Sequence, residues 1–218
     1  MERELTRWGV GFASGKVELF AGIRPADRGD FPNIGARGCF MSHLEVLKRA
    51  LSLGASRCLI MEDDLAIDPR LAAVEAELVA TLSSTPWSLV YFGYRGAVPP
   101  SSSDVLVRSE EEVTCAHFYG VSAQGLRPLV EFLETVLTRP PGHPDGGPMH
   151  YDGALTTFRA LNPGATLFAS PSLGTQRGSM SDITPGLLDR IPLVRDAVDQ
   201  ARRLRAHRAR LPTPAPVG

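Results

Sequence analysis

The chain has 218 residues, 43% of them hydrophobic, and a formal net charge of −1. This length and composition are sufficient for one globular domain with a buried core, and the near-zero net charge gives no general attraction to nucleic acid. No apolar run approaches the length of a membrane span, and the first residues do not resemble a signal peptide. The three cysteines, Cys39, Cys58 and Cys115, lie far apart, which favours reduced, buried thiols in a cytoplasmic protein over a disulfide framework or a zinc site.

In the first half of the chain, apolar residues at helical spacing alternate with apolar residues in the pattern of strands. A helix is expected over residues 2–8, a half-exposed strand over 17–20, and a loop rich in Gly, Asp and Pro over 22–32. Apolar residues at helical spacing predict a helix from Ile34 to Leu51, with Gly54 as its stop. A strand over 58–61, a helix over 69–82 and a strand over 87–92 follow.

The second half continues this alternation. After a Pro/Ser-rich loop over 95–104, we expect a strand over 113–121, a helix over 123–137, an irregular segment over 139–148, a helix over 151–161 and a strand over 165–169. Strands that alternate with helices predict an α/β fold whose sheet is mostly parallel and flanked by helices. We expect one such domain over residues 1–190 and a separate tail over 191–218.

Three consecutive carboxylates, Glu62, Asp63 and Asp64, follow the predicted strand 58–61 directly. Ligands of α/β sheets bind at the carboxyl ends of strands, so this position favours a functional role. In an extended backbone Glu62 and Asp64 share one face and Asp63 points away. Two such oxygen ligands suit Mg²⁺ or Mn²⁺ held together with substrate phosphates. The alternative is an acidic turn that faces water.

Several segments in order resemble glycosyltransferase family 25, the family of lipopolysaccharide and lipooligosaccharide galactosyltransferases with collagen galactosyltransferases as relatives. Residues 35–44 (GARGCFMSHL) and 59–64 (LIMEDD) resemble the family's Gly-x-x-Gly-Cys-x-x-Ser-His segment and its strand ending in Glu-Asp-Asp. Downstream, the segments 116–122, 151–155 and 171–183 resemble further family elements. Together these motifs extend over about residues 22–183, which makes a chance similarity a poor explanation.

The resemblance implies a GT-A-like fold and an enzyme that moves a hexose, galactose from a UDP-sugar, onto a saccharide hydroxyl with inversion. The composition, in which Lys occurs only at Lys16 and Lys48 and Ala, Gly and Pro are abundant, favours a bacterial source. It also implies Mn²⁺ or Mg²⁺ on Glu62 and Asp64, where the ion acts as a Lewis acid on the leaving diphosphate. Asp152 matches the family's isolated aspartate and is the candidate base for the acceptor hydroxyl. Since aspartate is common at helix starts, a helix cap is the alternative role for Asp152.

The remaining site candidates are predicted substrate ligands. His43 lies within the first motif, where it either approaches a diphosphate or satisfies a backbone carbonyl. Asp63 completes the acidic triplet. Gln176 and Ser181 lie in a Gly/Ser-rich segment that either closes over the donor or forms an ordinary turn.

Two departures from the family pattern motivate a rival prediction. The family opens with a strand and an Asp-Arg-Arg-type turn that are not found ahead of the helix over 2–8, and Ala36 stands where the family has an acidic residue. The alternative function is therefore an inactive homologue that serves as a binding or scaffolding subunit. A metal-dependent phosphoesterase uses the same carboxylates but leaves the other motifs unexplained. A sheet that lacks one strand exposes an edge, so we expect a homodimer.

The tail has a separate character. Residues 191–211 combine an apolar stripe with many arginines, and a Pro-rich segment over 212–218 follows. A basic amphipathic helix of this kind can lie on an anionic membrane such as the bacterial inner membrane, near a lipid-linked acceptor. Docking on its own domain or on a second subunit is the alternative.

Overall fold

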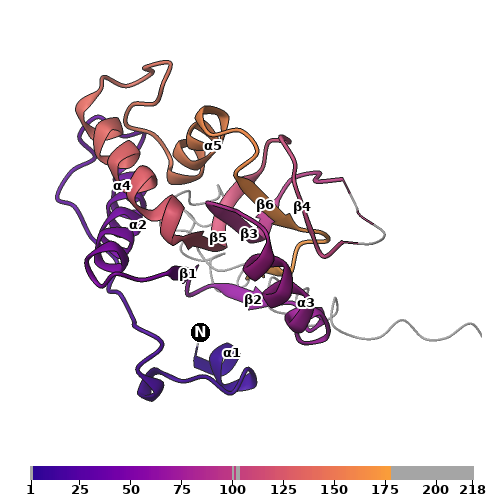
Figure 1. The fold of residues 1–218 in the computed structure, drawn as a ribbon. Coiled ribbons are helices and arrows are strands. Elements are labelled where there is room, and N and C mark those ends of the chain that lie inside the picture. The colour runs from indigo at the N-terminus through magenta and orange to yellow at the C-terminus, as the bar shows by residue number, and fades with distance from the viewer. Residues whose placement is uncertain (1, 100, 102–103, 178–218) are drawn as a thin grey trace, which may run out of the picture.

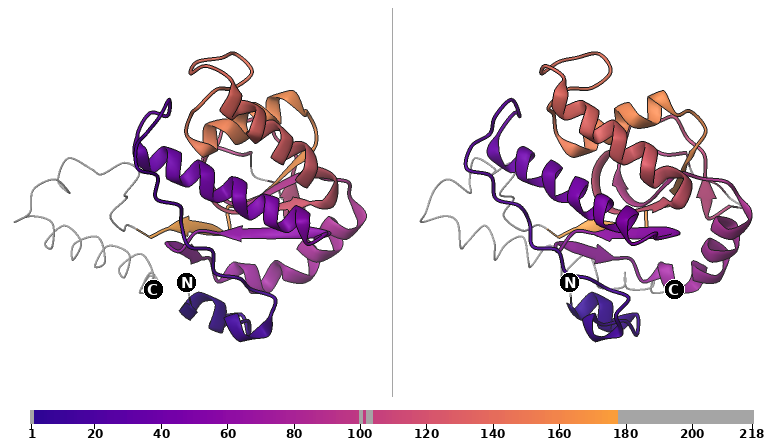
Figure 2. Two further views of the ribbon diagram at one scale, coloured as in Figure 1. Left: turned by 90° about the vertical axis from the view of Figure 1, so that its left-hand side faces the viewer. Right: turned by 60° about the vertical axis from the view of Figure 1, so that its left-hand side comes forward.

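The structure is a computed structural model that describes residues 2–99, 101 and 104–177. The helices are α1 (Glu2–Arg7), a short 3-10 helix (Phe12–Ser14), α2 (Ile34–Ser52), α3 (Arg70–Ser84), α4 (Ala123–Thr138) and α5 (Tyr151–Leu161). The strands are β1 (Arg57–Met61), β2 (Leu65–Ile67), β3 (Leu89–Arg95), β4 (Leu106–Val107), β5 (Thr114–Ser122), β6 (Thr166–Ala169) and β7 (Gly174–Gln176). Helices α2, α4 and α5 cover one face of the sheet and α3 the other (Figures 1 and 2).

The sheet is mixed, with the strand order β1-β5-β3-β6-β4 and with β7 joining β2 to β3. Strand β5 runs antiparallel to both β1 and β3, whereas β6 runs parallel to β3. The predicted α/β class with flanking helices is confirmed, but the prediction of mostly parallel pairing is wrong. Parallel neighbours need a crossover connection, usually a helix, and the described residues between β3 and β5 contain only the two-residue strand β4.

Most predicted elements form within two or three residues of their expected bounds. The strand expected over residues 17–20 does not form, and the side chain of Leu19 is 72% exposed. The segment has no neighbouring strand to pair with, so its backbone N–H and carbonyl groups gain no protein partners in place of water. The short strands β2, β4 and β7 were not predicted, because two or three residues are too few to show a periodicity.

Strand β3 explains how one sheet supports two cores. Leu89 and Tyr91 belong to the apolar cluster under α2, α4 and α5, while Val90 and Phe92 belong to the cluster that includes α3. Successive strand residues point to opposite faces, and a central strand covered on both sides is apolar throughout. The acidic residues that follow β1 therefore lie at the rim of a sheet whose interior is closed.

The start of α2 is built from the glycine-rich motif. Asn33 caps the helix by accepting a hydrogen bond from the Ala36 N–H at 2.7 Å. Ser42 accepts from the Ile23 N–H at 2.8 Å, and a Cβ atom on Gly38 would lie 2.6 Å from the Ile23 carbonyl oxygen. Two motif residues therefore serve to hold the loop 22–32 against the helix.

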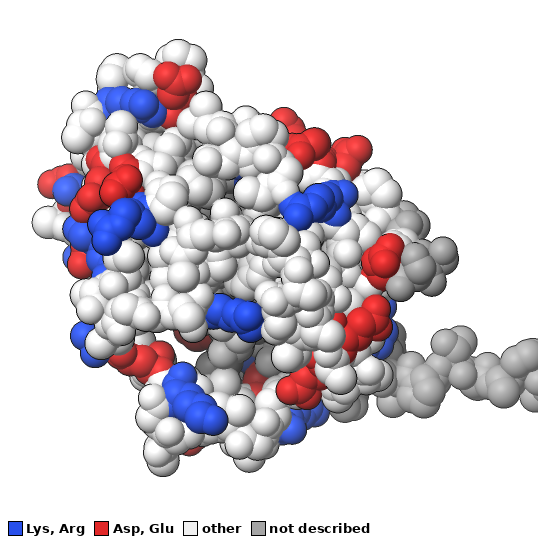
Figure 3. Space-filling view, in the orientation of Figure 1, with Lys and Arg blue, Asp and Glu red and all other residues white. Residues whose placement is uncertain are grey.

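Charged side chains of both signs are interspersed over the face shown in Figure 3. No helix in the described part of the chain is both long and apolar enough to cross a membrane. The tail over 191–218, its basic stretch and the candidate ligand Ser181 all lie outside the described residues.

Candidate functional site

The acidic triplet forms the connection between β1 and β2. The Glu62 N–H donates to the carbonyl of His117 at 2.9 Å, and the Leu65 N–H donates back to the Glu62 carbonyl at 3.1 Å, which closes a turn. The extended backbone predicted here is therefore wrong. The predicted separation of the side chains is nevertheless present, because Asp63 is exposed while Glu62 and Asp64 are partly buried.

Arg177, which follows β7, stabilises this turn by binding the main-chain carbonyl groups of the turn. Its N–H donates to the Asp64 carbonyl at 2.7 Å, its Nε to the same oxygen at 3.3 Å, and its Nη2 to the Asp63 carbonyl at 3.2 Å. Its Nη1 also lies 3.9 Å from a carboxylate oxygen of the buried Glu4 in α1. Sequence analysis missed Arg177, although its position directly after Gln176 was a usable signal.

Glu62 brings together two of the predicted substrate ligands. One carboxylate oxygen lies 3.4 Å from His43 Nε2, and the other accepts a hydrogen bond from Gln176 Nε2 at 3.0 Å. Burial by itself raises the pKa of Glu62, but the hydrogen bonds and the charge of His43, together with Gln176, outweigh it and lower the pKa. The Glu62 carboxylate is therefore held in its charged form.

His43 is fixed by two buried tyrosines that sequence analysis did not identify. Its Nδ1 lies 2.9 Å from the hydroxyl of Tyr119 on β5, and that hydroxyl lies 2.8 Å from the hydroxyl of Tyr151 on α5. The imidazole also stacks on the Tyr151 ring, with 4.1 Å between ring centroids. Both ring nitrogens of His43 thus have defined partners, and Nε2 is directed at Glu62.

Asp64 is the incompletely satisfied member of the turn. Its Oδ1 is buried and has no hydrogen-bond partner. Burial, followed by the charges of Glu62 and Asp63, raises the pKa of Asp64 to about 6 despite the opposing charge of Arg177. An unpartnered buried carboxylate oxygen is costly, and a hard divalent cation is a fitting partner for it. The assignment of a Mg²⁺ or Mn²⁺ ion to Glu62 and Asp64 stays a prediction, with which the unpartnered Asp64 oxygen is compatible.

Asp152 lies in the first turn of α5, but it is not the N-cap residue, which is His150. Its two carboxylate oxygens accept hydrogen bonds from the Gly153 N–H at 2.9 Å and from the Cys115 N–H at 3.1 Å. Cys115 has a φ of 71°, an uncommon conformation for a residue with a side chain. The Asp152 carboxylate therefore joins α5 to an unusual point of β5.

Asp152 and Glu62 share one electrostatic neighbourhood. Burial, followed by Glu62 and then Asp152, raises the pKa of the Cys39 thiol to about 12. The same two carboxylates also raise the pKa of Cys115, again after burial. Glu62 and Asp152 therefore act on the same two thiols.

His117 has a supporting position below the turn. The imidazole is fully buried, its Nε2 lies 3.2 Å from the Gly174 carbonyl oxygen, and burial lowers its pKa. The main-chain carbonyl of His117 also accepts the hydrogen bond from the Glu62 N–H. His117 therefore links β5, β7 and the acidic turn.

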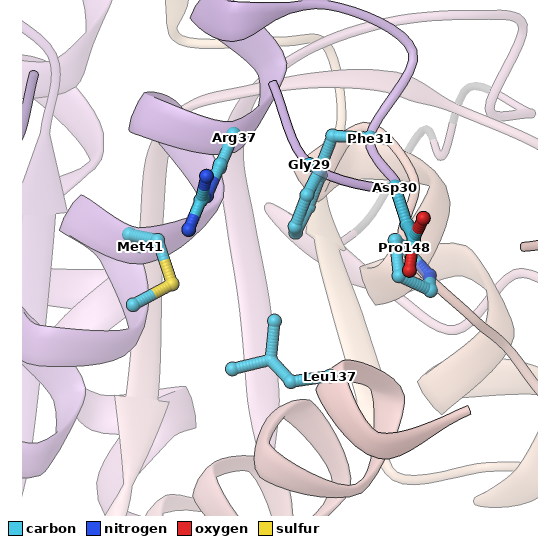
Figure 4. Close-up of a pocket in the computed structure, with 7 residues that line it drawn as sticks. All are labelled: Gly29, Asp30, Phe31, Arg37, Met41, Leu137 and Pro148. Carbon is cyan, nitrogen blue, oxygen red and sulfur yellow. The ribbon is translucent and has the colours of Figure 1, made fainter. Parts of the chain in front are cut away.

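A separate cavity of about 330 Å³ lies beside α2 (Figure 4). Arg37 and Met41 of α2 line it, and they are two residues away from Cys39 and His43, which places them on the opposite side of the helix. The rest of the lining comes from Gly29, Asp30, Phe31, Leu137 and Pro148. None of the predicted site residues that the structure describes lines this cavity.

Comparison with known proteins gives one informative match. No family model matches the chain. A protein of Aedes aegypti described as a glycosyltransferase 25 family member is 27% identical over 104 residues. The match covers 45% of this chain and only 17% of the relative's length. This similarity supports the resemblance to glycosyltransferase family 25.

Proposed function

We propose that the protein is a glycosyltransferase that moves a hexose from a nucleoside diphosphate sugar to a saccharide hydroxyl. The observation that carries the proposal is the acidic turn, in which the buried Asp64 Oδ1 lacks a hydrogen-bond partner beside a charged Glu62. A leaving diphosphate develops negative charge, and such a site provides for a cation that offsets it. The similarity to a glycosyltransferase 25 family member supports the same reaction class.

Glu62 and Asp64 would hold the Mn²⁺ or Mg²⁺ ion, which supplies Lewis-acid stabilisation of the leaving group when bound. The protein's own residues orient this pair. Gln176 fixes one oxygen of Glu62, His43 faces the other, and Arg177 holds the Asp64 backbone. Such outer contacts keep ligating carboxylates in position before the ion arrives.

Asp152 is the proposed base. In an inverting transfer the acceptor hydroxyl attacks from the side opposite the leaving group, and one carboxylate oxygen of Asp152 takes up its proton. Asp152 belongs to the same electrostatic neighbourhood as Glu62, as their joint effect on Cys39 indicates.

The donor that the family resemblance favours is UDP-galactose, and the acceptor is a lipid-linked bacterial saccharide of the lipopolysaccharide class. For this role we propose a cytoplasmic protein whose basic stretch over 191–211 contacts the inner membrane. We further propose that it acts as a homodimer.

One observation favours the rival function, an inactive binding subunit. Both oxygens of Asp152 already accept backbone N–H bonds, which gives the carboxylate a structural role that needs no reaction. A scaffold needs Asp152 only to join α5 to β5.

The deciding experiment is a thermal-shift screen of the full chain against UDP-hexoses, each with and without Mn²⁺. We expect stabilisation by a UDP-hexose that requires Mn²⁺, since a ligand that binds only the folded state raises its stability. Glu75→Gln is the matched control, because Glu75 is an exposed carboxylate of α3 with no predicted ligand role and the variant should keep the shift. Absence of any shift across the panel would favour the scaffold.

A further inference from the structure

A second group of metal-ligating atoms lies against the acidic turn. One ligand atom each of Cys39, His43 and Glu62 lies within 4.8 Å of the other two. Cys39 and His43 are four residues apart on α2 and therefore share a face of the helix, while Glu62 arrives from the end of β1. The function proposed above uses Glu62 with Asp64 and gives Cys39 no role.

We propose that Cys39 Sγ, His43 Nε2 and the Glu62 carboxylate form a binding site for Zn²⁺ or a similarly soft divalent ion. The site shares Glu62 with the proposed Mn²⁺ pair but differs from it in ligand type. Thiolate and imidazole ligands suit zinc, whereas magnesium and manganese take oxygen ligands. Zinc bound here would therefore withdraw Glu62 from the Mn²⁺ pair, a consequence that rests on the proposed function.

The separation of His43 Nε2 and the Glu62 oxygen fits a shared ion. Two zinc ligands at about 2.0–2.1 Å and at a tetrahedral angle lie about 3.3–3.4 Å apart. The observed distance is 3.4 Å, which is longer than the roughly 2.7–2.9 Å of a charged N–H···O bond. The spacing of the two groups therefore matches that of two ligands of one zinc ion.

The groups behind these ligands hold them in place. Tyr119 contacts Nδ1 of His43 and Tyr151 stacks on its ring, so that Nε2 stays directed at Glu62. A tyrosine hydroxyl can accept a hydrogen bond from Nδ1–H, so this contact permits the tautomer in which Nε2 carries no proton and can bind a metal ion. Gln176 binds the other oxygen of Glu62. Zinc-ligating histidines and carboxylates are characteristically held by outer contacts of this kind.

The surrounding charge favours a cation at the same point. Glu62 and Asp152 both act on the Cys39 thiol with a negative potential. Zinc displaces the thiol proton to solvent on binding, and a divalent cation then offsets the combined charge of thiolate and carboxylate. Cys39 and Glu62 are both partly exposed, so the three ligands are not closed off from solvent.

The test uses Co²⁺ as a spectroscopic probe and Zn²⁺ as a competitor, added to the reduced full chain. We expect a near-ultraviolet thiolate-to-cobalt absorption that Zn²⁺ abolishes. Cys39→Ser and Cys39→Ala should both lose this absorption and weaken Zn²⁺ binding by on the order of a hundredfold. The matched controls Cys58→Ser and Cys115→Ser remove the other two thiols and should keep it. No absorption in the parent chain, or its persistence in both Cys39 variants, overturns the proposal.

A second pair of measurements separates this site from the proposed enzyme function. Asp64→Asn should lose Mn²⁺-dependent UDP binding and keep the cobalt–thiolate absorption. Cys39→Ser should lose the absorption and keep the UDP binding, which Zn²⁺ no longer inhibits. If the parent chain binds Co²⁺ through Cys39 but never binds UDP, the zinc site stands and the proposed function fails. If UDP binds and the absorption is absent, the zinc site fails alone.

Discussion

Two adjoining regions of the site differ in how completely their polar groups are satisfied. In the aromatic network, which we define as His43, Tyr119 and Tyr151, the hydroxyl and imidazole contacts lie at 2.8–2.9 Å. In the acidic turn over 62–64, Asp64 Oδ1 is buried without a partner, and Arg177 binds main-chain carbonyls rather than that oxygen. Glu62 belongs to both regions.

This difference suggests that the aromatic network supports the structure and that the acidic turn is the part suited to bind a ligand. Buried polar groups with full hydrogen bonding rigidify the structure around them, and the aromatic network does so for α2, β5 and α5. An unsatisfied buried carboxylate costs stability unless a ligand completes it. In the acidic turn, the carboxylate that the proposed function needs is therefore also the group that lowers the stability of the ligand-free fold.

The largest expected effect comes from removing the unsatisfied carboxylate. Asp64→Ala should abolish Mn²⁺-dependent UDP binding, because one of two proposed ligands is lost. The fold should remain and its stability should hold or rise, since the substitution relieves repulsion between neighbouring carboxylates. Calorimetry measures the binding and thermal unfolding the stability; Mn²⁺-dependent UDP affinity equal to that of the parent chain would refute the metal role of Asp64.

Asp152→Asn tests the proposed base. We expect the variant to bind donor normally and to transfer sugar at least about a hundredfold more slowly, because an amide cannot take up the acceptor proton. Single-turnover transfer and equilibrium donor binding distinguish these steps. A rate near that of the parent chain would leave Asp152 with only its bonds to Cys115 and Gly153.

The aromatic network should respond through stability. Tyr119→Phe removes a hydroxyl that contacts both His43 and Tyr151, leaving buried groups without a partner at a cost of about 2 kcal/mol. Tyr94→Phe is the matched control, since its hydroxyl makes one bond, to the Ala169 carbonyl at 2.8 Å, and should cost about 1 kcal/mol. Denaturant unfolding compares them, and equal losses would show that the network has no additional role.

The smallest expected effect is a pH dependence at Asp64. Its pKa is raised from 3.8 to about 6, so the folded protein binds this proton more tightly than the unfolded chain. The metal-free protein should therefore lose stability as pH rises from about 4 to 6, relative to Asp64→Asn, and the difference should be constant above that range. Because Asp64 is only partly buried, water limits the effect to below about 1 kcal/mol.

Parallel pH titrations of thermal stability in the two proteins make this measurement. A difference that does not change between pH 4 and pH 8 would contradict the raised pKa of Asp64.

Local sequence was a good guide to the elements and a partial guide to the site. The period of apolar residues placed α2 to α5 and the main strands, and the end of β1 pointed to Glu62 and Asp64. His43 and Gln176 were found only through the resemblance to the family's motifs. It failed for the exposed segment 17–20, which has the alternation of a strand without a pairing partner. It also failed for the sheet, where β5 lies antiparallel between β1 and β3.

By itself, the sequence determined the α/β alternation, the position of the acidic turn and the motif that begins α2, because each depends on residues close together in the chain. Only the tertiary structure decided that Tyr119, Tyr151 and Arg177 support the site, since 76 residues separate Tyr119 from His43 and 113 separate Arg177 from Asp64. Strand direction was likewise decided by long-range pairing. Contacts between distant residues follow from how the whole core closes, and no local period records them.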